Sequence, residues 1–144
     1  MYLIDTNVIS AVSPPHKPAP ELSAWLDRRS DELFLSAVTI AEIDAGIAKV
    51  RREGASRKAR DLSAWLETLL HLYGDRVLAF DTETARVTGA LSDRARAQGR
   101  PPGLADLIIA ATAKHHDLTI LTRNLKHFTP LGVRAHDPLV RLPG

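Results

Sequence analysis

Short apolar runs alternate with longer amphipathic segments along this chain. The apolar runs are only a few residues long and rich in leucine, isoleucine and valine, which is typical of buried strands. They stand at residues 3–4, 33–35, 77–80 and 119–121, with a candidate edge strand at 133–135. The segments between them repeat apolar residues at helical spacing, and predict helices at 6–13, 21–29, 36–52, 57–73, 82–98 and 105–116.

Strands that alternate with helices indicate parallel β-α-β units. The predicted fold class is therefore α/β, with a central mostly parallel sheet of four to five strands covered on both faces, in a three-layer α/β/α arrangement. The segment 105–116 is apolar almost all round, which predicts a buried helix. Four prolines between residues 14 and 20 predict a stiff loop around His16 and Lys17.

Composition narrows the class of protein. The chain has 144 residues, of which 44% are hydrophobic and 25% charged, so we expect one domain over residues 1–144 with a substantial core. It has no cysteine, which excludes disulfides and thiolate metal sites and fits a reducing compartment. No run approaches the roughly 20 apolar residues that cross a bilayer, and no secretory signal is evident. We expect a cytoplasmic protein without membrane contact.

The net charge is mildly basic at +2, which permits a nucleic-acid partner without requiring one. More informative are two strands that run directly into polar residues. Asp5, Thr6 and Asn7 follow residues 3–4, and Thr122, Arg123 and Asn124 follow residues 119–121. Ligands of open α/β folds bind at the carboxyl edge of the sheet, where such residues meet. Asp5 and Asn124 would equally serve as caps of the helices that follow them.

Two acidic residues on helices are further candidates. Glu42 has Val38, Ala45 and Gly46 as its neighbours one helical turn away, which leaves space around its carboxylate. The common role of such a glutamate is nevertheless an exposed position on an amphipathic helix. Asp106 begins the apolar helix, where a lone charge needs a partner, a metal or a helix-end position.

These acids would conflict if they met. Carboxylates a few ångströms apart raise one another's pKa, and a bound divalent cation removes that conflict. Oxygen ligands without histidine or cysteine favour Mg²⁺ or Mn²⁺ over Zn²⁺. Such ions serve phosphate chemistry, because they neutralise phosphate oxygens and activate a bound water.

Four blocks of this sequence, 3–10, 35–42, 106–113 and 121–128, resemble the PIN domain of VapC-type toxins, and most closely the FitB-like branch. The blocks occur in the order and at the spacing of that family, over essentially the whole chain. The resemblance implies an endoribonuclease that depends on Mg²⁺ or Mn²⁺ and forms the toxin half of a type II toxin–antitoxin pair.

The resemblance also implies roles for single residues. Asp5, Glu42 and Asp106 fall on the catalytic acids that bind the metal, Glu42 directly or through water. Asn124 stands where a fourth catalytic acid is usual, which lowers the charge of the site by one. Residues expected to support or line the pocket are Thr6, Asn7, Thr122 and Arg123.

The partners implied are an RNA substrate, a second copy of the chain in a homodimer, and a small antitoxin whose C-terminal segment occupies the active-site groove. Operator DNA would be bound only through the antitoxin. Basic residues at 49–60, together with Arg94, Arg96 and Arg100, would either follow an RNA backbone or simply form solvated helix ends.

Several other features have ordinary explanations. His115 and His116 are adjacent on a helix and point about 100° apart, so they cannot chelate one ion. His127 is predicted in the wall of the pocket or on the surface. Trp25 and Trp65 are predicted in the core, with the alternative that Trp65 lines a dimer or antitoxin groove.

Two other functions fit parts of the pattern: a catalytically inactive PIN-like domain that binds nucleic acid, and a Mg²⁺-dependent receiver-like signalling module. A receiver would have paired acids after its first strand and a lysine near its last. This chain has one acid, Asp5, and Arg123 at those places.

Overall fold

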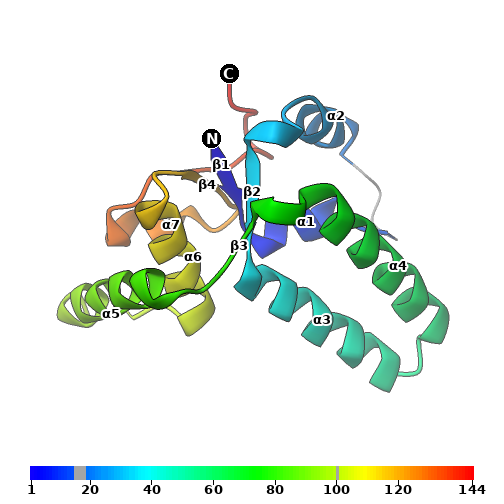
Figure 1. Cartoon of the computed structure of the whole chain (residues 1–144), viewed down its shortest axis with the longest axis horizontal. Coiled ribbons are helices and arrows are strands. Elements are labelled where there is room, and N and C mark those ends of the chain that lie inside the picture. The colour runs from blue at the N-terminus through cyan, green and yellow to red at the C-terminus, as the bar shows by residue number, and fades with distance from the viewer. Residues whose placement is uncertain (15–18, 100) are drawn as a thin grey trace.

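A parallel sheet of five strands forms the centre of the computed structural model, which describes residues 1–14, 19–99 and 101–144 (Figure 1). The strands are β1 (Tyr2–Ile4), β2 (Leu33–Ser36), β3 (Val77–Leu78), β4 (Thr119–Leu121) and β5 (Ala135–His136). Their order across the sheet is β3-β2-β1-β4-β5, and every adjacent pair is parallel. The predicted α/β class is confirmed, and the sheet has the larger of the two strand numbers expected.

Helices cover both faces of this sheet. The α-helices are α1 (Thr6–Ala11), α2 (Pro20–Arg28), α3 (Ala37–Arg52), α4 (Ser56–Tyr73), α5 (Thr82–Ala97), α6 (Leu104–His115) and α7 (Leu125–Phe128). Short 3₁₀ turns are η1 (Ser30–Glu32), η2 (Gly74–Arg76) and η3 (Thr129–Leu131). In Figure 1, α3 and α4 form a long helical hairpin on one side of the sheet, and α5, α6 and α7 gather on the other.

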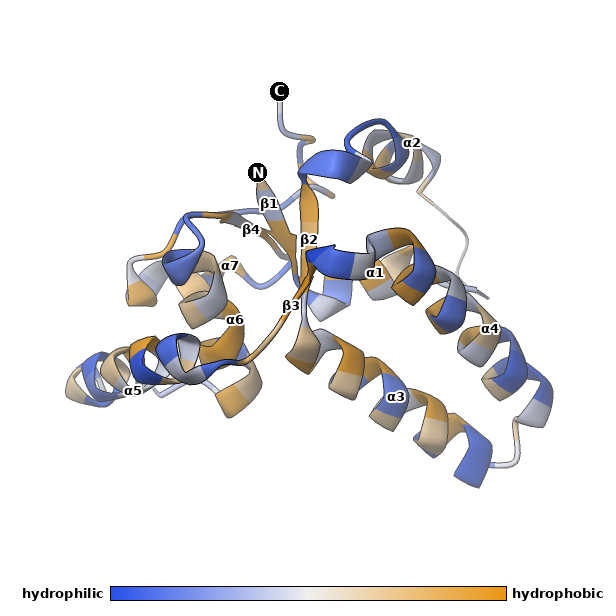
Figure 2. Cartoon of the chain, viewed as in Figure 1, coloured by the Kyte–Doolittle hydropathy of each residue, from blue (hydrophilic) through white to orange (hydrophobic). Residues whose placement is uncertain are grey.

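Alternation of side chains along the central strands explains the two layers. Ile4 and Leu121 pack into a core with residues of α1 to α4, whereas Leu3 and Ile120 pack into a second core with residues of α5, α6 and α7. Successive residues of a strand point to opposite faces, so both faces of β1 and β4 are apolar and buried. Figure 2 shows β2 mostly in hydrophobic colours, whereas α4 and α5 alternate between hydrophobic and hydrophilic residues.

Helix boundaries follow local chemistry. Ser36 accepts a hydrogen bond from the backbone N–H of Val38 at 3.2 Å and caps α3. Gly54 ends the α3 segment with a φ of +85°, a conformation that glycine adopts without a steric penalty. The helix predicted at 6–13 ends two residues earlier than expected, at Ala11.

Two strand predictions need correction. The strand predicted at 77–80 ends at Leu78, because its partner β2 ends at Ser36 and offers no backbone for further pairing. The edge strand predicted at 133–135 is shifted to Ala135–His136, which lie opposite Ile120 and Leu121.

The predicted proline loop includes residues 15–18, which lie outside the described residues. Among the residues that the structure describes, no helix is long and apolar enough to cross a membrane.

Candidate active site

The candidate site lies at the carboxyl edge of the sheet, next to β1. The strand β1 stands between β2 and β4. The chain adds β2 and β3 on one side of β1 and then crosses to add β4 and β5 on the other side. Such a switch in strand order opens a crevice at the carboxyl ends of the strands, which is where α/β folds bind ligands. Asp5 comes directly after β1, and its backbone N–H donates to the carbonyl of Leu121 at 2.9 Å. The end of β1 is thereby held against the end of β4.

A cavity of about 270 Å³ opens at this edge, and we call it the acidic cavity. Its lining brings together residues that are far apart in the sequence, from the end of β1, from α1, α3 and α6, and from the loop after β4. They are Asp5, Thr6, Asn7, Ser10, Glu42, Asp106 and Asn124. Six of these seven are residues that the sequence selected for the site, and Ser10 is the addition. Ser10 lies one turn of α1 beyond Thr6, which is the signal that would have found it.

Asp5 is the buried member of the cavity, with 5% of its surface exposed. Its Oδ1 accepts from the backbone N–H of Thr6 at 2.8 Å, so it does cap α1. Its Oδ2 accepts from the hydroxyl of Thr122 at 2.8 Å and from the amide of Asn7 at 3.2 Å. Capping α1 and membership of the site are therefore compatible, since different oxygens serve the two roles.

Burial raises the pKa of the Asp5 carboxyl above its ordinary value. Hydrogen bonds from Thr122 and from the backbone of Thr6 oppose that rise, while the nearby charges of Asp106 and Glu42 add to the rise in pKa. The buried carboxylate therefore lies in a site that disfavours its own negative charge. A cation at this place would reverse that balance.

Glu42 reaches the cavity from α3 and remains exposed to solvent. Its Oε1 accepts a hydrogen bond from the hydroxyl of Thr6 at 2.6 Å, and that hydroxyl lies 3.1 Å from the hydroxyl of Thr39. Thr39 is fully buried one turn before Glu42 on the same helix. Sequence reasoning missed this contact, although the spacing of three residues on a helix placed both side chains on one face.

Asp106 enters the cavity from the first turn of α6, as predicted for a charge at a helix end. Its Oδ2 lies 3.0 Å from Nδ1 of His127, which belongs to α7. His127 was predicted in the pocket wall or on the surface. It is half-buried and is not among the described residues that line the acidic cavity, but it contacts one acid of the site. No sequence spacing indicated this contact, because α6 and α7 are separated by β4.

The residues after β4 contribute in different ways. Thr122 is fully buried behind Asp5 and does not line the cavity. Arg123 acts through its backbone, whose N–H donates to the side-chain oxygen of Asn7 at 3.1 Å, while its side chain is exposed. Asn124 lines the cavity, and its backbone N–H donates to the hydroxyl of Thr122 at 3.0 Å. Asn124 does occupy the N-cap position of α7, but its side chain forms no capping hydrogen bond to that helix.

The site is open rather than a closed cage of protein ligands. Within the described residues, no three acidic, histidine or cysteine side chains are arranged to hold a metal ion as they stand. Mg²⁺, however, keeps several of its waters when it binds. Proteins therefore usually hold it with only one or two carboxylates. The oxygen-rich donor set therefore fits a hard divalent cation and does not fit a closed zinc site.

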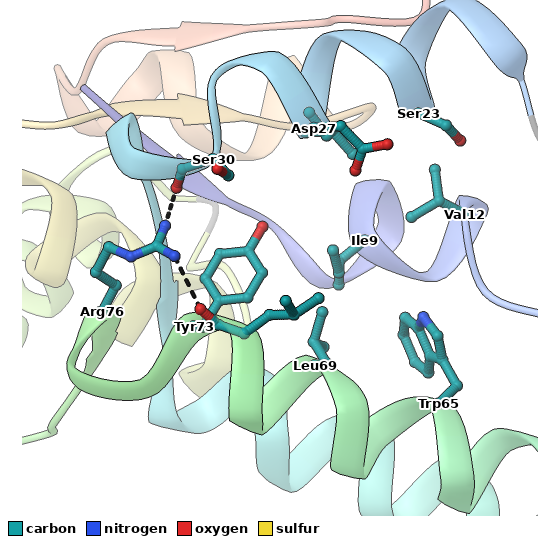
Figure 3. Close-up of a pocket in the computed structure, with 11 residues that line it drawn as sticks. Ile9, Val12, Ser23, Asp27, Ser30, Trp65, Leu69, Tyr73 and Arg76 are labelled. Carbon is teal, nitrogen blue, oxygen red and sulfur yellow. Dashed lines mark hydrogen bonds between the residues drawn. The ribbon is translucent and has the colours of Figure 1, made fainter.

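A larger groove of about 460 Å³ lies elsewhere, between α1, α2 and α4 (Figure 3). Figure 3 shows Trp65 and Leu69 of α4 facing Ile9 of α1 and Val12, which follows α1, across the groove. Its lining is mainly apolar and shares no residue with the acidic cavity. Trp65 is therefore a half-buried groove residue, whereas Trp25 is in the core as predicted.

No basic residue is among the described residues that line the acidic cavity. The basic residues at the turn between α3 and α4 are all exposed, namely Lys49, Arg51, Arg52, Arg57, Lys58 and Arg60. Arg94 and Arg96 are exposed in the last turn of α5, and Arg100 lies outside the described residues. His115 ends α6, and its Nε2 lies 3.1 Å from a carboxylate oxygen of Glu83.

Known proteins resemble this chain over nearly its whole length. The family model of the PIN domain matches residues 2–129. Toxin FitB of Neisseria gonorrhoeae is 36% identical over 140 residues, which cover 96% of this chain and 98% of FitB. The VapC ribonuclease Y4jK of Sinorhizobium fredii is 34% identical over 140 residues, covering 96% of this chain and 97% of Y4jK.

A solved structure agrees with this relationship. The structure of FitAB bound to an IR36 DNA fragment contains a chain that superposes with a TM-score of 0.79 at 33% identity. The match covers 96% of this chain and 95% of that one. A receiver-like module is thereby excluded. The chain belongs to the PIN-domain family, as a VapC-type toxin of the FitB-like branch.

Proposed function

We propose that this chain is an endoribonuclease that hydrolyses RNA phosphodiester bonds with Mg²⁺ or Mn²⁺ at the acidic cavity. It is the toxin of a type II toxin–antitoxin pair, and acts in the cytoplasm, where its RNA substrate is found, as one PIN domain over residues 1–144. The observation that carries the proposal is the meeting of Asp5, Glu42 and Asp106 in one small cavity at the sheet edge. Relatives that match most of the chain are named VapC ribonucleases.

The metal follows from the donor set. Nucleases of the VapC type with a PIN domain generally depend on a divalent metal. Asp5 and Asp106 are the proposed direct ligands, and Glu42 takes part directly or through water. Asn124 offers an amide oxygen in place of a further carboxylate, so the site carries one negative charge less. The bound ion would neutralise a phosphate oxygen and lower the pKa of a bound water.

The chain's own residues orient this chemistry. Hydrogen bonds from Thr122, Asn7 and the Thr6 backbone hold Asp5 in one orientation. The oxygen of a water attacks the phosphorus while the bond to the 3′-oxygen breaks, which leaves 5′-phosphate and 3′-hydroxyl products. Glu42 is exposed and held by the Thr6 hydroxyl, so it is the group proposed to accept the proton of that water.

We propose that this chain has the same kinds of partner as its relatives. The FitAB structure contains DNA, and its toxin chain covers nearly all of this one. A small antitoxin therefore binds this chain, with its C-terminal segment in the active-site groove, and operator DNA is bound through that antitoxin. The chain also forms a homodimer, as proposed from the family.

The alternative of a catalytically inactive PIN-like domain has less support. A domain that had lost catalysis would be expected to have lost the acids as well, because selection would no longer keep these acids. All three acids are present and line one cavity. The departure at Asn124 removes one charge and leaves the proposed ligands of one ion in place.

The test is replacement of Asp106 by asparagine, which keeps an oxygen that accepts from His127. We expect Asp106→Asn to abolish cleavage, by more than about 100-fold, because residues that merely support metal ligands are already worth about 10- to 100-fold. The measurement is sequencing of RNA 5′ ends after induced expression, with circular dichroism to verify the fold.

The matched control is Asp93→Asn, which changes an exposed acid of α5 outside the cavity and should cleave like the wild type. Cleavage by Asp106→Asn at the same RNA 5′ ends as the wild type, at equal expression of both variants, would refute the assignment.

A further inference from the structure

A second cavity, of about 500 Å³, adjoins the acidic cavity at Asp106, and we call it the side cavity. Asp106 lines both. The lining of the side cavity comes from the end of α5, the loop before α6, and the segment of α7 and η3. Its residues are Gln98, Pro101, Pro102, Gly103, Asp106, Lys126, His127, Pro130 and Leu131.

Continuity between the two cavities is a consequence of the fold. The loop that ends at Gly103 leads directly into the first turn of α6, where Asp106 stands. His127 comes from α7 and lies 3.0 Å from Asp106, so it forms part of the wall next to the proposed metal ligand. A polymer with one phosphate in the acidic cavity would therefore place the neighbouring unit at the side cavity.

The walls suit a flat ring with polar edges. Pro101, Pro102 and Leu131 supply apolar surface, and the His127 imidazole supplies a planar one. Histidine is among the side chains on which unpaired RNA bases stack. The volume lies within the range of about 300–1,000 Å³ that is typical of small-ligand pockets.

The polar groups of the cavity match a nucleotide. Gln98 is exposed, and its amide carries both hydrogen-bond donors and an acceptor, as is needed to read the edge of a base. Lys126 is exposed and cationic, which suits a phosphate. Asp106 is the one carboxylate among the described lining residues, and it belongs to the proposed metal site.

We infer that the side cavity binds an unpaired nucleobase of the RNA strand next to the scissile phosphate, and that Gln98 determines which base is preferred. The inference rests on the proposed ribonuclease function and names the form of its substrate. Bases of a duplex are stacked and paired, so the substrate is single-stranded RNA or a loop. Lys126 contacts the phosphate on the far side of the bound base.

The experiment uses short single-stranded RNAs with one cleavage site, in which an abasic residue replaces each nucleotide in turn. For the wild type, kcat/KM should fall at least about fivefold when the abasic residue stands at one particular position next to the cut, which is the lower range for loss of base stacking. Equal rates at every position would overturn the inference.

A cavity-filling variant provides the decisive comparison. No atom lies within 4 Å of a Cβ placed at Gly103, so Gly103→Phe adds bulk at the cavity without a backbone clash. In this variant an abasic residue should no longer lower kcat/KM, because the filled cavity does not admit the base in any case. Gly89→Phe, on α5 and equally open around its Cβ, should keep the wild-type pattern.

Gln98→Leu tests the discrimination itself. It should change the relative kcat/KM among the four bases at that position by about fivefold or more, as expected for loss of a hydrogen-bond pair to a base edge. An unchanged order and spread of the four rates would contradict the role of Gln98.

A binding measurement separates this inference from the proposed function. Glu42→Gln keeps the acceptor for the Thr6 hydroxyl and lies outside the side cavity, so fluorescence anisotropy with the same RNAs reports binding without cleavage. A wild type that cuts no RNA refutes the ribonuclease. A wild type that cuts RNA with no positional effect in cleavage or in binding refutes the side cavity alone. Impaired antitoxin binding in Gly103→Phe, with RNA preference unchanged, assigns the cavity to the antitoxin and also refutes the inference.

Discussion

The hydroxyl of Thr122 contacts three residues of the candidate site. It donates to Asp5 at 2.8 Å, accepts from the backbone of Asn124 at 3.0 Å and lies 3.5 Å from the amide of Asn7. Thr122 is fully buried, so these contacts are shielded from water. One hydroxyl thus sets the orientation of the buried acid and the position of the loop after β4.

Replacing Thr122 by valine keeps the shape and removes the hydroxyl. We expect the Mg²⁺ or Mn²⁺ concentration for half-maximal cleavage to rise about 10- to 100-fold, because outer residues that orient metal ligands have effects of this size. Cleavage is measured across a metal titration. Thr88→Val is the control, since Thr88 is also buried and donates to a helix carbonyl at 2.8 Å far from the site. Equal metal dependence in both variants would contradict the role of Thr122.

Single residues at strand ends were predictable from the sequence, but pairs of side chains were not. Asp5 and Thr122 follow apolar runs directly, so their place at the sheet edge follows from the strand pattern alone. The contact of His127 with Asp106 depends on how α7 is placed against α6, and no periodicity encodes that placement.

Among the helices, α4 closes the apolar groove against α1 and α2, and Tyr73 is the residue at its end. Only 9% of Tyr73 is exposed. Burial raises the pKa of the Tyr73 phenol to about 12, although the positive charge of Arg76 acts in the opposite direction. The Arg76 guanidinium also lies over the Tyr73 ring, 5.0 Å from its centre. Packing of this helix end therefore favours the neutral phenol.

This packing predicts a loss of stability at alkaline pH. Between pH 10 and about 12 the unfolded chain loses the Tyr73 proton and the folded chain keeps it, so the free energy of unfolding falls as pH rises through that window. The full loss is about 2–3 kcal/mol. Urea denaturation at several pH values should show a flatter dependence above pH 10 for Tyr73→Phe than for the wild type. Parallel curves for the two proteins would contradict a buried neutral phenol.

Helices were more predictable than strands at this scale. The segment at 57–73 has enough turns for its 3.6-residue pattern to be unambiguous, and α4 has almost the same bounds. The short run at 77–80 does not define where its strand ends, because the length of an edge strand depends on how far its partner extends.

Over the whole molecule, the fold brings like charges together. Asp5 directly follows β1, Glu42 and Asp106 lie on α3 and α6, and all three line the acidic cavity. The other two carboxylates contribute to the raised pKa of Asp5, after burial itself. This concentration of negative charge costs folding free energy, which a bound cation would offset.

Binding of Mg²⁺ or Mn²⁺ should therefore stabilise the protein. At a metal concentration about 100 times Kd, the free energy of unfolding increases by about 2.7 kcal/mol, or about 5–10 °C in Tm for a chain of this size. Thermal denaturation with increasing metal measures the shift. Asp106→Asn should lose most of it and Asp93→Asn should keep it. A shift of the same size in both variants would indicate binding elsewhere.

The α/β class, the apolar strands and the acids at the strand end and helix start follow from the sequence, because they depend on local periodicity and on the chemistry of each position. Tertiary structure decides which of those side chains meet. It joins Thr6 to Glu42, Thr122 to Asp5 and His127 to Asp106, and it opens a second cavity beside the first. Such contacts join residues 21 to 117 positions apart, and their distances depend on the packing of helices on both faces of one sheet.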